Sequence, residues 1–319
     1  MTGSTRRLVV PEWYDFTGTV SGLAFGPRDP CVRVLDGSLW WVARTADGLG
    51  TLRLTRDSAG LLATAWGPGA DWLLDRADAV AGLRDDVSEF EAIATRHPVV
   101  AQLAKVHRGM RLPATGGVYQ RLLRAVLEQK VTGTEAYRAY TAIVRHCHRE
   151  TGREPAPGPT PGLLPPPDAA TVAATPYWVF HGFGVEQRRA DTLARASVAA
   201  TRLERCADAI EAQRRLTAIP GIGPWTSAEV LRVAYGDPDV VSVGDYHIPH
   251  RVAWVLAGEI RAGSRESAPG RLSDADQRML ELLEPFRGHR GRVCGLMERA
   301  GLSAPRFGPR MTIRSFAKF

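Results

Sequence analysis

The feature that most constrains this chain is the stretch over residues 216–231, which reads LTAIPGIGPWTSAEVL. Its apolar periodicity runs up to Ile219, stops over residues 220–224 and begins again at Trp225. An apolar helical period on each side of a short run of glycine and proline is typical of two helices joined by a tight turn. The stretch therefore predicts a helical hairpin.

The composition of the turn indicates what the hairpin is for. Gly221 and Gly223 have no Cβ and tolerate positive φ, so their backbone amides can approach another molecule closely. Pro224 suits the first turn of the second helix, where its missing N–H costs no hydrogen bond. The free amides at such a helix start attract a phosphate group. Ile219 and Ile222 are predicted to be buried and to fix the angle between the helices.

A single aspartate follows the hairpin at a distinctive distance. Asp245 lies twenty positions after Trp225, behind a short extended run and just before a new apolar helical period. We expect it at the N-cap of the next helix.

The hairpin sequence and its spacing to Asp245 resemble the helix-hairpin-helix DNA glycosylases, the HhH-GPD superfamily, and within it the alkylation-repair branch of 3-methyladenine-DNA glycosylase II. The similarity extends from about Tyr14 to about Leu296. It implies an α+β fold, with an N-terminal α+β domain over residues 1–108 that contains an antiparallel β-sheet. An all-α helix-hairpin-helix glycosylase domain is expected over residues 109–319.

Charge and cysteine usage agree with that resemblance. The net charge is +7, and a basic balance suits a polyanion such as double-stranded DNA. The four cysteines are far apart in the sequence, and His146, Cys147 and His148 point in different directions on one helix, so no metal site is predicted. Without an apolar run long enough for a membrane span, we expect a cytoplasmic protein that has no membrane partner. The resemblance implies a monomer.

The secondary-structure pattern supports the two parts. Residues 14–66 alternate short apolar runs with Asp-Gly turns, which indicates antiparallel strands followed by a helix over residues 70–83. Trp40 and Trp41 are predicted to face opposite sides of the sheet. Helical periods follow over residues 87–107 and 118–128, and residues 152–167 are too rich in proline and glycine for anything but an exposed loop.

A break between two predicted helices exposes Gln129 and Lys130. Thr132 and Glu135 have the spacing of a capping box, which starts a new helix directly after the break. In the family that this chain resembles, the corresponding junction inserts side chains into the gap left by the extruded base, often with an apolar residue where this chain has Lys130. The alternative is that Lys130 is simply a solvated junction residue.

The resemblance implies that Asp245 is the catalytic residue. Breaking a deoxyribosyl N-glycosidic bond builds positive charge on the sugar, in parallel with O-glycoside hydrolysis. A carboxylate that receives hydrogen bonds at a helix start is stabilised as an anion and can stabilise that charge and orient water. The alternative is that Asp245 only caps a helix.

Trp225 and Glu229 are predicted to line the base pocket. An aromatic wall suits a positively charged alkylated base, and an acidic residue would also favour one. Glu229 stands where the alkylation branch often has an aromatic residue, so the substrate could also be a different kind of damaged base. The alternatives are a core position for Trp225 and a solvated one for Glu229. Predicted DNA contacts are Gln129, Lys130, Gly221, Ile222, Gly223, Thr226 and His247.

The predicted function is therefore base excision repair of DNA by a monofunctional glycosylase acting on damaged, alkylated bases. No cofactor is required, although the family allows a monovalent cation held by the carbonyls of the hairpin turn. One alternative is a bifunctional glycosylase/lyase acting on oxidised bases, for which Lys130 would have to supply the amine. Another is a DNA-binding protein that recognises damage without catalysis.

Overall fold

The computed structural model describes residues 3–26, 28–264 and 271–305. The strands are β1 (Ser4–Leu8), β2 (Val32–Leu35), β3 (Ser38–Thr45), β4 (Gly48–Asp57) and β5 (Gly60–Trp66). The first helices are α1 (Phe16–Val20), α2 (Ala70–Asp75), α3 (Ala77–Val80), α4 (Phe90–Ala94) and α5 (Pro98–Val106). The others are α6 (Val118–Leu127), α7 (Gly133–Glu150), α8 (Ala169–Ala174), α9 (Tyr177–Gly182), α10 (Gln187–Val198), α11 (Ala200–Glu204), α12 (Ala209–Thr217), α13 (Pro224–Ala234), α14 (Ile248–Ala257), α15 (Asp274–Leu283) and α16 (Arg290–Arg299). Short 3-10 turns at Ser21–Leu23 and Glu284–Phe286 complete the described elements. The α+β class predicted from the sequence is confirmed.

The sheet is antiparallel throughout the described residues, with the strand order β1-β5-β4-β3-β2. The predicted Asp-Gly turn joins β2 to β3, where Asp36 and Gly37 have φ of 49° and 68°. Two left-handed residues match the twist of a two-residue hairpin. The sequence did not predict β1, because its residues STRRL contain a single apolar side chain and the strand is held at the sheet edge by its backbone pairing with β5.

The two adjacent tryptophans of β3 face opposite sides of the sheet, as predicted. Trp41 lies in the main core, whereas Trp40 lies on the other face and stacks on Trp66 with ring centroids 5.8 Å apart. Leu163 packs over this tryptophan pair and is only 4% exposed. Residues 152–167 are therefore irregular, as predicted. The prediction that the whole segment is exposed is wrong near its end, because Leu163 is buried against the two tryptophans of the outer face.

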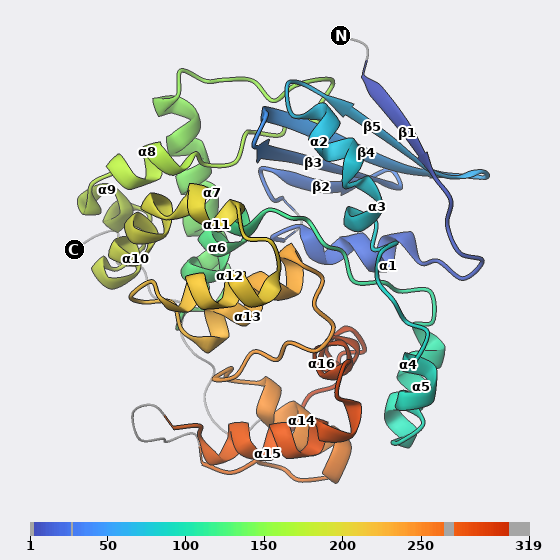
Figure 1. Ribbon diagram of the computed structural model, residues 1–319. Helices are drawn as coiled ribbons and strands as arrows, with labels where there is room; N and C mark the ends of the chain where they lie inside the picture. Colours follow the sequence, from blue (N-terminus) through green and yellow to red (C-terminus); the bar gives the residue numbers. More distant parts are fainter. Residues whose placement is uncertain (1–2, 27, 265–270, 306–319) are drawn as a thin grey trace.

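Two of the apolar clusters among the described residues are large. The larger core joins the inner face of the sheet to α1, α6, α7, α10 and α13. The smaller core joins α4 and α5 to α14, α15 and α16, which lie at the lower part of Figure 1. The first core thus includes elements from both sides of residue 108, and the domain boundary there stays a prediction.

Local sequence signals set the helix ends. Helix α5 begins with Pro98 behind His97, and α6 ends at Leu127. Thr132 and Glu135 form both hydrogen bonds of the predicted capping box at the start of α7. The break between α6 and α7 includes Lys130, whose φ of 55° is in the left-handed region. Such a conformation is uncommon for a residue with a side chain.

Candidate active site around Asp245

The predicted hairpin is formed by α12 and α13. Ile219 and Ile222 are each 5% exposed and are buried in the main core. Gly221 has φ of 99°, and a Cβ there would lie 2.2 Å from Thr192 Oγ1 of α10, so this position requires glycine. Gly223, in contrast, has φ of −103° and is the extended N-cap of α13. Only one of the two glycines therefore serves the turn by its left-handed conformation.

The start of α13 is open to an external acceptor. Its N-cap is Gly223, no side chain caps the helix, and Pro224 occupies the first turn. The amides of a first helical turn have no acceptor within the helix. An uncapped start of this kind favours an anion such as a phosphate group.

Other side chains hold the carbonyls of the hairpin turn. Arg195 Nε donates to the Pro220 carbonyl at 3.0 Å, and Gln129 Nε2 donates to the Gly221 carbonyl at 3.0 Å. The Ile219 carbonyl accepts the Ile222 amide. Two of the turn carbonyls thus accept side-chain hydrogen bonds, and the monovalent cation that the family allows stays a prediction.

The junction between α6 and α7 is joined to the hairpin. Gln129 Nε2 also donates to Thr226 Oγ1 at 2.8 Å, so one amide group contacts both the turn and α13. Thr226 is 2% exposed. Its hydroxyl is therefore buried and accepts a hydrogen bond from Gln129, and the DNA contact of Thr226 stays a prediction. Lys130, next to Gln129, is exposed.

The structure brings Asp245 to the hairpin. Trp225 Nε1 donates to Asp245 Oδ2 at 3.1 Å. Asp245 Oδ1 accepts the backbone amides of His247 and Ile248 at 2.7 and 2.8 Å. Asp245 is not the N-cap as predicted; His247 is, and Asp245 lies two residues earlier and reaches forward to the helix start. The carboxylate is half-buried and is held by one indole and two amides.

These contacts leave part of the carboxylate available. A carboxylate has about four acceptor positions, two on each oxygen. Both positions of Oδ1 and one position of Oδ2 are used by the three donors. Among the contacts of the described residues, one acceptor position on Oδ2 therefore remains.

Trp225 and His247 lie at the surface around this carboxylate. Trp225 is half-buried, which excludes the alternative of a fully buried core position. His247 is exposed, and its ring packs edge-on against Tyr246 with centroids 4.8 Å apart. Tyr246 is 63% exposed and was not predicted from the sequence as a site residue. Its position directly after Asp245 was the available signal.

Glu229 is buried rather than solvated. Its carboxylate accepts from Arg121 at 2.5 Å, from Arg232 at 2.8 Å and from the Ser242 hydroxyl at 2.7 Å. Burial alone would raise the pKa of Glu229, but Arg232, Arg121 and Ser242 together lower it to about 2. Its oxygens are therefore occupied by other side chains, and this carboxylate is poorly placed to line a base pocket.

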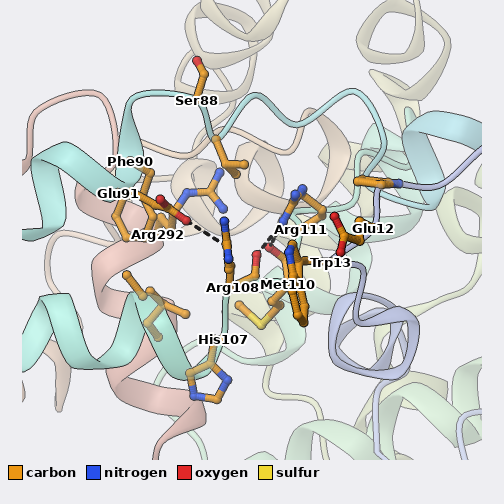
Figure 2. A pocket seen from close by; sticks show the side chains of 14 residues that line it. Glu12, Trp13, Ser88, Phe90, Glu91, His107, Arg108, Met110, Arg111 and Arg292 are labelled. Atoms are coloured by element: carbon orange, nitrogen blue, oxygen red, sulfur yellow. Dashed lines mark hydrogen bonds and ion pairs between the residues drawn. The ribbon is translucent and has the colours of Figure 1, made fainter.

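A cavity of about 420 Å³ lies elsewhere, between residues 11–13, helices α4 and α5, and α16. Figure 2 shows Trp13, Arg108 and Arg111 on its wall, with Arg108 directed towards Glu91. Arg108 Nε lies 3.1 Å from Glu91 Oε1. None of the predicted site residues lines this cavity.

The described part of the chain has no candidate metal centre and no helix suited to cross a membrane. No group of three or more His, Cys, Asp or Glu side chains there is arranged to hold a metal ion. Within the same residues, no helix combines the length and the apolar character needed to cross a membrane.

The fold is that of DNA glycosylases of known structure. The 3-methyladenine DNA glycosylase from Archaeoglobus fulgidus is similar over 92% of this chain and 97% of its own length, with a TM-score of 0.69 and 16% sequence identity. An 8-oxoguanine glycosylase/lyase from Clostridium acetobutylicum, in complex with double-stranded DNA containing cytosine opposite 8-oxoguanine, is similar over 94% of this chain and 96% of its own, with a TM-score of 0.64 and 12% identity. The sequence matches no protein-family model and no curated protein. The resemblance seen in the sequence is thus confirmed at the level of the fold, which glycosylases for two kinds of damaged base share.

Proposed function

We propose that this protein is a DNA glycosylase that hydrolyses the N-glycosidic bond of a damaged, alkylated base rotated out of duplex DNA. One observation carries the proposal: the half-buried Asp245 carboxylate is held against Trp225 at the start of the hairpin helix, with one acceptor position left. A carboxylate in that state is suited to stabilise a sugar cation at the moment when it forms.

The chemistry needs little beyond that anion. As the bond from C1′ to the base nitrogen breaks, its electron pair leaves with the base, and an alkylated base that was cationic departs neutral. Asp245 stabilises the positive sugar and accepts a hydrogen bond from the attacking water. The water oxygen then bonds to C1′ and its proton is lost to the carboxylate or to solvent. The nucleotide must first leave the base stack, at a cost of about a few kcal/mol.

DNA binding is assigned to the surface formed by the hairpin and the neighbouring junction. The uncapped start of α13, with Gly221 and Gly223, offers amides to a backbone phosphate. Lys130 is exposed beside Gln129, which is itself bonded to the turn. The net charge of +7 favours association with a polyanion. His247 adds a side chain next to the carboxylate.

The monofunctional assignment depends on where lysines lie. A glycosylase/lyase needs an amine that attacks C1′ and forms a Schiff base. The described lysines are Lys105, on α5, and Lys130 at the α6–α7 junction, so the hairpin helix has none. The exposed position of Lys130 favours the bifunctional enzyme as the second candidate. Borohydride trapping on damaged DNA decides: a covalent adduct that disappears in Lys130→Ala would establish the lyase.

The direct test is base release from methylated genomic DNA, measured by mass spectrometry of the free bases. Asp245→Asn should abolish release while DNA affinity stays close to wild type. Asp208→Asn is the matched control, because Asp208 also accepts a helix amide, at the start of α12, without contacting Asp245. Release at the wild-type rate by the Asp245 variant would refute the catalytic assignment. Tight binding to damaged DNA without release of any base would instead establish a non-catalytic binding protein.

A further inference from the structure

The segment over residues 242–245 has no regular secondary structure, yet it determines where the Asp245 carboxylate lies. Glu229 holds one end of the segment, since its Oε1 accepts the Ser242 hydroxyl at 2.7 Å. The Ser242 carbonyl in turn accepts the Asp245 amide at 3.2 Å. Helix α13 therefore holds Asp245 twice: directly through Trp225, and through Ser242 from Glu229, one helical turn further along.

A second buried carboxylate holds the same segment from the opposite helix. Asp276 of α15 accepts the Gly244 amide on Oδ1 at 2.9 Å. Its Oδ2 accepts the Ser273 hydroxyl at 2.6 Å, and Ser273 is the N-cap of α15. Asp276 is 6% exposed, and Gly244 has φ of 88°. The residue just before Asp245 is thus tied to α15 in a conformation that favours glycine.

Buried carboxylates are costly, which makes two of them on one short segment informative. A buried charge is tolerated only when hydrogen bonds or opposite charges compensate it. The two arginines beside Glu229 supply opposite charge, and the Ser242 hydroxyl adds a hydrogen bond from outside the ion pairs. A purely structural ion pair between α6 and α13 would leave that bond unexplained, whereas a role in placing Asp245 accounts for it.

We propose that Glu229 and Asp276 are positioning residues that hold residues 242–245 from two sides and so fix the Asp245 carboxylate beside the hairpin. The proposal rests on the proposed function and deepens it. Neither carboxylate touches the substrate: Glu229 acts through Ser242, and Asp276 acts through Gly244. It also replaces the base-pocket role predicted for Glu229 with a role in alignment.

The variants can separate alignment from stability. Ser242→Ala removes the hydroxyl that links Glu229 to the segment and leaves the ion pairs of Glu229 in place. Asp276→Ala removes the acceptor for the Gly244 amide, whereas Asp276→Asn keeps an acceptor oxygen and should restore activity. Asp29→Asn is the control, because Asp29 is fully buried and accepts three backbone amides in the N-terminal part of the chain.

Single-turnover base release, corrected for the folded fraction, should fall about 10- to 100-fold in Ser242→Ala and Asp276→Ala, because small displacements of a reacting group have effects of that order. DNA affinity should change by less than about threefold, since the hairpin contacts remain. Asp29→Asn should lower thermal stability without lowering the rate per folded molecule.

Amide hydrogen exchange provides a readout that does not depend on activity. Residues 242–248 should exchange faster in Ser242→Ala and Asp276→Ala than in the wild type, and should be unchanged in Asp29→Asn. Wild-type rates and wild-type exchange in both alanine variants would overturn the positioning role while leaving the proposed function intact. Full activity of Asp245→Asn would overturn both proposals together, so the two failures are distinguishable.

Discussion

Replacing Trp225 by phenylalanine should slow base release by removing one donor from the catalytic carboxylate. The ring remains, but the 3.1 Å bond from Nε1 to Asp245 Oδ2 is lost. A hydrogen bond to a charged group contributes about 1.5–3 kcal/mol, and about 1.4 kcal/mol changes a rate tenfold. Because the amides of His247 and Ile248 still hold Oδ1, we expect the lower part of that range, a loss of about 10- to 30-fold.

The assay is single-turnover release of methylated bases, with DNA affinity measured separately by fluorescence anisotropy. Trp178→Phe serves as the control, because Trp178 lies on α9 and is 74% exposed. It should leave both the rate and the affinity unchanged. A lower rate with unchanged affinity for damaged DNA in Trp225→Phe would support the hydrogen-bonding role.

Two results would contradict this reasoning. A wild-type rate in Trp225→Phe would show that the indole N–H does not help to hold Asp245 in the reacting complex. A wild-type rate in Trp225→Phe combined with a large loss in Trp225→Ala would show instead that the ring acts as a stacking wall. The pair of substitutions therefore separates the two functions that one side chain can have here.

The remaining predictions concern the hairpin, the buried glutamate and the junction. Gly221→Ala should lower the free energy of unfolding in urea by at least about 1–3 kcal/mol, because its Cβ would meet Thr192 in a left-handed conformation, whereas Gly223→Ala should be nearly neutral; equal effects would contradict the geometry. Since the folded state lowers the pKa of Glu229 from 4.5 to about 2, its contribution to stability is complete above pH 4.5 and is lost as the pH falls towards 2. The melting temperature of Glu229→Gln should therefore depend less on pH across that interval than that of the wild type. The same dependence in both proteins would contradict the stabilising role of the Glu229 carboxylate. Lys130→Ala should weaken DNA binding and reduce the salt slope by about 1, and an unchanged slope would show that Lys130 contacts no phosphate.

Much of the fold was predictable because local signals coincide with the observed elements. The capping box at Thr132, the Asp-Gly turn at residues 36–37 and the boundary at His97 each fix an element end through a hydrogen bond or a backbone conformation that one residue type favours. Strand β1 could not be predicted in the same way. Its pairing partner, β5, lies more than fifty residues later, and only that partner makes a strand of a mostly polar segment.

The part of the site that depends on the spacing of residues along the sequence was predictable. The part that depends on ion pairs between residues far apart in the sequence was not. The contact between Trp225 and Asp245 agrees with the hairpin-to-aspartate spacing. The burial of Glu229 depends on Arg121, which lies 108 positions away on α6. Arg189 illustrates the same limit, because this charged side chain is 3% exposed and donates to the Leu127 carbonyl, 62 positions away in the sequence.

In the proposed function, helix α13 connects DNA binding to catalysis because its first residues have different partners. Thr226 accepts the amide of Gln129, which also holds the turn, while the neighbouring Trp225 holds Asp245. A change that displaces α13 as a whole therefore moves the phosphate-binding turn and the carboxylate together. Gln129→Ala, which removes two bonds to this helix and its turn, should lower DNA affinity and the rate of base release in parallel. A change confined to Asp245 or Ser242 should lower the rate alone. If Gln129→Ala lowered affinity but left the single-turnover rate unchanged, the turn and the carboxylate would be independent, and α13 would not couple them.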